Sequence, residues 1–97
     1  MNTPLSSAEI EIALSELPGW RLENDALEKT FKFHTFREAM SFIVRIAFEA
    51  EEIDHHPDLH NIYNRVTLRL NTHDADGKVT AKDVDLARRV QHISWVE

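Results

Sequence analysis

The feature that most constrains the fold is a proline preceded by two histidines near the middle of the chain. Residues 51–57 read EEIDHHP and end a long segment with an apolar helical pattern. Because the residue before a proline is disfavoured in the α region, His56 is expected to be extended. The sequence therefore predicts a helix-to-strand corner that carries His55 and His56.

The histidine pair indicates a site for proton transfer. Imidazole has the ordinary pKa nearest to neutral pH, and carboxylates flank the pair, so this corner can take up and return protons. A hydrated polar turn is the simpler alternative. A metal site is another, built from His55, His56, His73 and an acid such as Asp54 or Asp58. Adjacent residues of an extended chain point to opposite sides, and no helical segment has a His-x3-His pair, so we expect no metal.

The first third of the chain predicts a helix and a β-hairpin. Residues 6–9 (SSAE) match a capping box, and apolar residues recur at helical spacing up to the Pro-Gly pair at 18–19. Two alternating segments follow, joined by turn residues at 24–25. Lys29 interrupts the alternation because it shares the parity of the apolar residues Leu27, Phe31 and Phe33. We expect this aromatic row to pack in the core.

The longest helical segment begins at residues 35–38 (TFRE), a second capping-box pattern. One broad apolar face is expected to comprise Phe36, Ala39, Met40, Ile43, Ile46, Ala47 and Ala50. Three further apolar residues fall outside that face, namely Phe42, Val44 and Phe48. We therefore expect the helix to be covered on two sides or to pack against a second subunit. Its terminal acids oppose the helix dipole, and an i, i+4 contact between Glu51 and His55 is the expected compensation.

The second half predicts another hairpin and a last helix. Residues 59–72 read as two strands joined by a turn at 64–65. The end of the second strand lies beside the start of its antiparallel partner, so we expect His73 to lie near His55 and His56.

Residues 80–83 (TAKD) predict the start of the last helix. Asp83 stands at the third helical position, where an acid interacts favourably with the helix dipole. This structural role is sufficient to explain Asp83.

The order of elements is helix, strand, strand, helix, strand, strand, helix. It predicts an α+β fold with a four-stranded antiparallel sheet and three helices packed mainly on one face. The 97 residues form a single domain, residues 1–97. A chain this short buries only about 60–65% of its unfolded surface, so oligomerisation would add to its stability.

Composition narrows the classes of partner. The net charge of −6, from 11 basic and 17 acidic residues, disfavours nucleic acid. The absence of cysteine excludes a disulfide framework and a thiolate nucleophile. No apolar run approaches about 18 residues and the first residues lack a leader pattern, so we expect a cytoplasmic protein without membrane contact.

A longer signature surrounds the histidine pair. It reads Glu51-x3-His55-His56-Pro57-x5-Tyr63-x9-His73, followed by Asp83. This signature, together with NIYNRV at residues 61–66, resembles that of the pterin-4a-carbinolamine dehydratases. It covers about a third of the chain, and the order of helices and strands extends the resemblance over nearly all of it.

The resemblance implies a hydro-lyase that converts 4a-hydroxytetrahydrobiopterin to quinonoid dihydropterin and water, with no cofactor and no metal. Its pterin substrate is the product that an aromatic amino acid hydroxylase leaves, which implies a functional link to such an enzyme in recycling of the tetrahydropterin. The implied catalytic residues are His55, His56 and His73. The residues implied to bind or orient the substrate are Glu51, Tyr63 and Asp83, with Glu51 acting on His55.

The family's assembly, in which dimers extend the sheet and two dimers join through helices, implies a homodimer or homotetramer. Animal members also serve as dimerisation cofactors for a homeodomain transcription factor through helix surfaces. The alternative to catalysis is therefore a non-catalytic dimerisation or regulatory partner of a transcription factor or hydroxylase.

Overall fold

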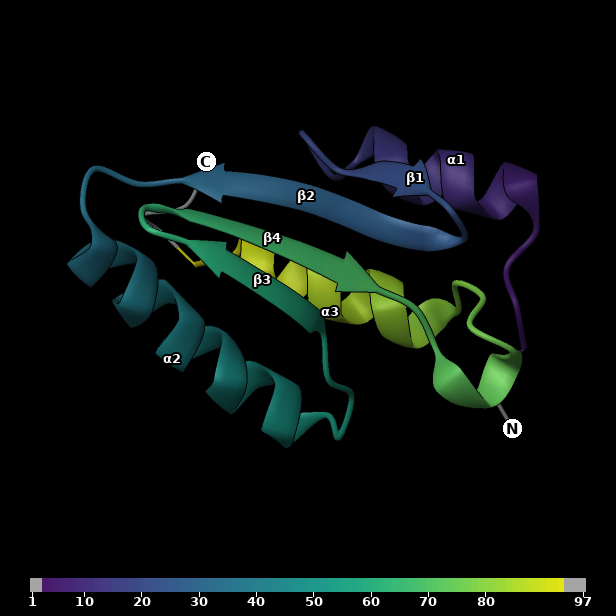
Figure 1. Ribbon diagram of the computed structural model, residues 1–97. Coiled ribbons are helices and arrows are strands. Elements are labelled where there is room, and N and C mark those ends of the chain that lie inside the picture. The colour runs from purple at the N-terminus through teal and green to yellow at the C-terminus, as the bar shows by residue number, and fades with distance from the viewer. Residues whose placement is uncertain (1–2, 94–97) are drawn as a thin grey trace.

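The structure is a computed structural model that describes residues 3–93 (Figure 1). Residues 1–2 and 94–97 of the expected domain lie outside the described residues. Within the described range, three helices and four strands follow the predicted order: α1 (Ser7–Ser15), β1 (Arg21–Glu23), β2 (Ala26–Lys32), α2 (Phe36–Glu52), β3 (Asp58–Ile62), β4 (Arg65–Leu70) and α3 (Ala81–Gln91). A short 3-10 helix, His73–Ala75, lies between β4 and α3.

The four strands form one antiparallel sheet in the order β1-β2-β4-β3. In Figure 1, α3 runs behind β4, and it packs against both central strands, β2 and β4. Alternate residues of these two strands are buried, among them Leu27, Phe31, Val66, Leu68 and Leu70. All three helices contribute to the same core cluster as these residues. The predicted α+β fold, with its helices mainly on one face of the sheet, is therefore confirmed.

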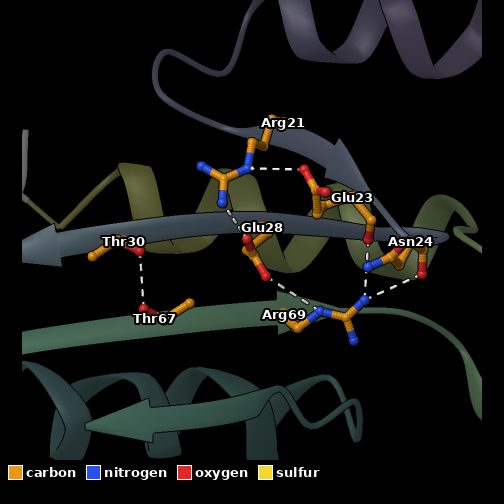
Figure 2. A network of polar contacts seen from close by, with 7 residues as sticks. All are labelled: Arg21, Glu23, Asn24, Glu28, Thr30, Thr67 and Arg69. Atoms are coloured by element: carbon orange, nitrogen blue, oxygen red, sulfur yellow. Dashed lines mark hydrogen bonds and ion pairs between the residues drawn. The ribbon is translucent and has the colours of Figure 1, made fainter. Parts of the chain in front are cut away.

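The opposite face of the sheet is polar (Figure 2). Arg69 Nε lies 3.3 Å from Glu28 Oε1, and Arg69 also donates to two carbonyl oxygens at the β1–β2 turn, at 3.0 and 3.1 Å. Glu28 pairs with Arg21 as well, and the hydroxyls of Thr30 and Thr67 are hydrogen-bonded across β2 and β4 at 2.9 Å. Cross-strand polar pairs of this kind suit a sheet face that none of the three described helices covers.

The two hairpin turns differ in how well the sequence predicted them. Asn24 and Asp25 have φ values of 47° and 63°, as a two-residue type I′ turn requires. The second turn was predicted at residues 64–65, but it falls one residue earlier and begins at Tyr63, whose φ is 50°. Asn61 accounts for this shift, because its side-chain amide donates to the carbonyl oxygens of Tyr63 at 3.2 Å and Arg65 at 2.9 Å.

Helix α2 buries a narrower face than predicted. Its buried residues are spaced three or four apart, at Ala39, Phe42, Ile46 and Ala50. Phe42 was expected outside the buried face, yet it is 0% exposed. Conversely, Phe36 and Ala47 were expected in that face and are exposed. The prediction of apolar surface left over on this helix is confirmed, with exposures of 47% for Phe36, 56% for Val44 and 69% for Phe48.

Lys29 points into the core side of β2, as its parity indicated, and is 6% exposed. Its ammonium donates to the carbonyl oxygen of Pro18 and to Gln91 Oε1, both at 2.7 Å. Burial lowers the pKa of Lys29 below its ordinary value, because the charged form loses its hydration. Neutral oxygens therefore hold this cation, and the core tolerates the break in the apolar alternation.

Candidate active site

A pocket of ≈ 390 Å³ lies where β3 begins and β4 ends. Residues 54–58 form one wall, residues 71–74 form another, and Lys82 from the first turn of α3 completes the lining. His55, His56 and His73 all border this pocket. The predicted meeting of the three imidazoles within one chain is therefore confirmed.

The corner that presents the histidine pair is a Schellman motif at the end of α2. The amide of His55 donates to the carbonyl oxygen of Ala50 at 3.0 Å, and the amide of Asp54 donates to that of Glu51 at 3.3 Å. Asp54 occupies the left-handed position of this motif with a φ of 51°. The reversal at Asp54 turns His55 inward before β3 begins at Asp58.

His55 is held by a buried carboxylate. Its Nε2 lies 2.6 Å from Asp83 Oδ1, and the exposed fractions are 8% for His55 and 0% for Asp83. The other oxygen of Asp83 accepts from the backbone amide of Thr80 and from the hydroxyl of Thr72, both at 2.8 Å. Asp83 therefore has two roles: it completes the capping box of α3, whose N-cap residue is Thr80, and it is a fixed partner for an imidazole of the pocket.

His56 has a different acidic partner. Its Nε2 lies 2.5 Å from Glu51 Oε2, where the side chains are 58% and 75% exposed. The expected contact between Glu51 and His55 is therefore wrong. The Schellman turn explains this, because it rotates His55 toward α3 and leaves His56 on the outer side next to Glu51. Such an exposed pair contributes only about 0–1 kcal/mol, so His56 is held far less firmly than His55.

His73 begins the 3-10 helix that follows β4. The preceding residue anchors this segment, because the carbonyl oxygen of Thr72 accepts from Ala75 at 3.0 Å and from Gly77 at 3.1 Å. The amide of Thr72 donates to the carbonyl oxygen of Lys78 at 2.9 Å. Gly77 has a φ of 72°, a conformation that favours glycine. Backbone hydrogen bonds thus fix the base of His73, while its side chain is exposed at the pocket.

Tyr63 is the predicted site residue that neither lines the pocket nor contacts a histidine of its lining, whereas Glu51 and Asp83 each contact one. It lies in the turn at the far end of the β3–β4 hairpin and is 64% exposed. It lies five residues beyond Asp58, the residue of the pocket that begins β3, which is about 16 Å at 3.3 Å per residue. A role for Tyr63 at this pocket within one chain is therefore not supported.

The sequence patterns did not single out four residues that line the pocket, Asn71, Thr72, Asp74 and Lys82. Thr72 carried a usable signal, because it ends a strand directly before His73 and lies eight residues from the helix cap Thr80. Asn71, Asp74 and Lys82 carried no such signal in the sequence. Within residues 3–93, no group of three or more His, Asp or Glu side chains is arranged to hold a metal ion.

The fold and the pocket together define a small α+β domain in which three imidazoles border one pocket. The family model for pterin 4 alpha carbinolamine dehydratase matches residues 3–93. A relative from Opitutus terrae is 65% identical over 96 residues, which cover 99% of each chain. A relative from Sulfolobus acidocaldarius is 48% identical over 89 residues, which cover 92% of this chain and 97% of the relative. The names of both relatives refer to the same dehydratase.

A solved structure shows the same likeness. The crystal structure of a transcriptional coactivator/pterin dehydratase from Brucella melitensis has a TM-score of 0.86 and 38% sequence identity, covering 91% of this chain and 95% of the other. The chain belongs to the pterin 4 alpha carbinolamine dehydratase family. The family expected from the histidine signature is therefore confirmed, and with it the enzyme class of hydro-lyases. Across the described residues, no helix is long and apolar enough to cross a membrane.

Proposed function

We propose that this chain dehydrates 4a-hydroxytetrahydrobiopterin to quinonoid dihydropterin and water, with His55, His56 and His73 as its catalytic residues. The convergence of these three imidazoles on one pocket of ≈ 390 Å³ carries the proposal. Sites for small molecules commonly have volumes of about 300–1,000 Å³, so a bicyclic pterin ring fits this pocket.

The reaction requires the transfer of two protons. The C4a–O bond breaks as the hydroxyl oxygen takes a proton from an acid and leaves as water. The N5 hydrogen passes to a base, and its bonding electrons form the C4a=N5 double bond. No electron is gained or lost overall, so imidazoles alone supply the chemistry that is needed. General acid–base catalysis of this kind supplies about 10²–10⁴-fold in rate.

The geometry suggests how the histidines divide this work. His55 and His73 transfer the protons, since His55 is held by Asp83 and His73 is fixed by its backbone on the facing wall. His56 positions the pterin and polarises the leaving hydroxyl. Glu51 orients His56 rather than His55, in keeping with their contact of 2.5 Å.

Single replacement of His55, His56 and His73 by alanine tests these roles. A hydroxylase that generates 4a-hydroxytetrahydropterin in the assay supplies the substrate, and dehydration is followed directly. We expect each replacement to lower the rate, by about 10²-fold for the two proton-transfer residues. His60→Ala is the matched control, because His60 is exposed on β3 and does not line the pocket. Wild-type rates in all three folded pocket variants would contradict the proposal.

We further propose that the reaction belongs to the recycling of tetrahydropterin for an aromatic amino acid hydroxylase in the cytoplasm, and that the chain acts as a homodimer or homotetramer. The exposed apolar residues of α2 and the edge position of β3 support self-association. Light scattering after size-exclusion chromatography tests it. Phe48→Glu is expected to lower the mass if copies join through α2, and a monomeric wild-type protein would contradict the assembly.

A second candidate is a regulatory partner role. The Brucella relative is described as a coactivator as well as a dehydratase, and exposed Phe36, Val44 and Phe48 give α2 an apolar surface suited to a protein partner. Capture of a hydroxylase or transcription factor that is lost with Phe48→Glu but retained with His73→Ala would favour this role. Capture of the partner that is lost with His73→Ala would contradict this role.

A further inference from the structure

A buried chain of hydroxyl groups leads to the carboxylate that holds His55. Thr80 Oγ1 and Thr72 Oγ1 lie 2.6 Å apart, and Thr72 Oγ1 lies 2.8 Å from Asp83 Oδ2. The exposed fractions are 2% for Thr80, 3% for Thr72 and 0% for Asp83. Hydrogen bonds between buried groups in a site of low polarity are directional and costly to break.

The direction of these hydrogen bonds follows from counting protons. Thr72 has one hydroxyl proton, and a carboxylate oxygen only accepts, so Thr72 donates to Asp83. Thr80 must therefore supply the proton that joins the two hydroxyls. The oxygen of Thr80 in turn accepts from the backbone amide of Lys82 at 3.3 Å. The chain thus runs in one direction, from the helix amide through two hydroxyls to the carboxylate.

This chain fixes what Asp83 offers to His55. Two donors meet at Oδ2, the Thr72 hydroxyl and the Thr80 amide, so this oxygen carries no proton. The second oxygen faces His55 Nε2 at 2.6 Å. When Asp83 is ionised, Oδ1 also accepts, and a neutral His55 ring then has its proton on Nε2. The second ring nitrogen of His55, Nδ1, then has no proton.

We propose that Thr72 is a positioning residue that holds His55 in the Nε2–H tautomer, with Nδ1 as an acceptor directed to the substrate. Thr80 also bonds to Asp83, but through a backbone amide that any residue would supply. Of the two donors to Asp83 Oδ2, only Thr72 donates from its side chain. Its backbone also starts the turn that carries His73, so this residue sets the position of two imidazoles. An acceptor at Nδ1 suits removal of the N5 proton, a role that rests on the proposed dehydratase function.

Nuclear magnetic resonance of ¹⁵N-labelled protein tests the positioning without any substrate, because the two imidazole nitrogens differ in shift according to which one is protonated. We expect wild-type His55 to show one neutral tautomer, Nε2–H. Thr72→Val is expected to give a mixture of tautomers, and Thr72→Ser is expected to restore the single form. Thr67→Val is the matched control, since Thr67 makes a similar hydroxyl contact at 2.9 Å on the other face of the sheet.

The same variants give the kinetic arm of the test. Thr72→Val should lower kcat roughly 10-fold to 100-fold, the value of one hydrogen bond to a charged group, with little change in KM. Thr72→Ser should stay within about threefold of wild type, since it keeps the donor. If Thr72→Val does not fold, the tautomer of His55 in the wild-type protein still tests the proposal. An Nδ1–H ring there would overturn it. A folded Thr72→Val variant in which His55 keeps the wild-type tautomer would also overturn the proposal, whatever its activity.

If the wild type has no dehydratase activity but Thr72→Val still changes the tautomer, the positioning by Thr72 is supported and the proposed function fails.

Discussion

Replacement of Asp83 by asparagine separates the shape of this side chain from its charge. Its Oδ2 accepts from Thr72 and from the amide of Thr80, so the single oxygen of an asparagine must take that place. The amide nitrogen then faces His55 Nε2 and donates to it. We expect His55 to move its proton to Nδ1, which removes the acceptor from the pocket.

The magnitude follows from the three hydrogen bonds at Asp83. The hydrogen bonds from Thr72 and Thr80 keep their geometry but lose a charged acceptor. The hydrogen bond with His55 reverses its direction. The cost of burying a charge disappears, which offsets part of the loss. We therefore expect a loss of only about 1–3 kcal/mol in the free energy of unfolding. The rate should fall much more, by about 10²–10⁴-fold, because one of the proton-transfer groups is in the wrong tautomer.

The assay compares kcat for dehydration with the free energy of urea unfolding. Asp85→Asn is the matched control on the same helix, because Asp85 is exposed and pairs only with Arg89 among the described residues, at 3.6 Å. The control should change kcat less than about twofold, since an exposed ion pair has little effect. A folded Asp83→Asn enzyme with wild-type kcat would refute the reasoning.

Three further predictions concern the core. Phe42→Ala should lower the free energy of urea unfolding by about 3–5 kcal/mol, because Phe42 is 0% exposed and its ring centroid lies 4.8 Å from that of Phe31. A loss below about 1 kcal/mol would contradict its burial. Gly19→Ala should lower the Tm, because Gly19 has a φ of 84° and an added Cβ would lie 2.9 Å from Lys29 Cε; an unchanged Tm would contradict this crowding. Since burial lowers the pKa of Lys29, the unfolded chain binds more protons, so the free energy of unfolding should rise as the pH approaches the ordinary value of 10.5. Lys29→Met should flatten that rise, and identical pH profiles would show that burial does not affect Lys29.

The sequence was sufficient to predict the fold because its boundaries are marked by strong local signals. Capping residues at Ser6, Thr35 and Thr80 begin the three helices, and each side chain makes the expected bond to a backbone amide. Antiparallel pairing of the second hairpin then placed His73 opposite the histidine corner. The predicted pocket needed no more than this topology.

The sequence did not indicate which acidic residue contacts which histidine. It depends on the left-handed conformation of Asp54, a position that glycine commonly fills and that an aspartate does not mark. With that reversal, His55 contacts Asp83 across 28 residues, whereas His56 takes the partner expected for His55. The shift of the second turn to Tyr63 has a similar cause, since it depends on side-chain bonds from Asn61 that propensities do not capture.

The chemistry that we propose for this pocket is proton transfer on a bound pterin. Its most direct test is the rate at which quinonoid dihydropterin forms from freshly generated 4a-hydroxytetrahydropterin, with and without the purified chain. We expect a rate that rises in proportion to the protein concentration, with an acceleration of about 10²–10⁴-fold that is lost in the folded His55→Ala variant. A rate equal to the spontaneous one in the presence of folded wild-type protein would contradict it.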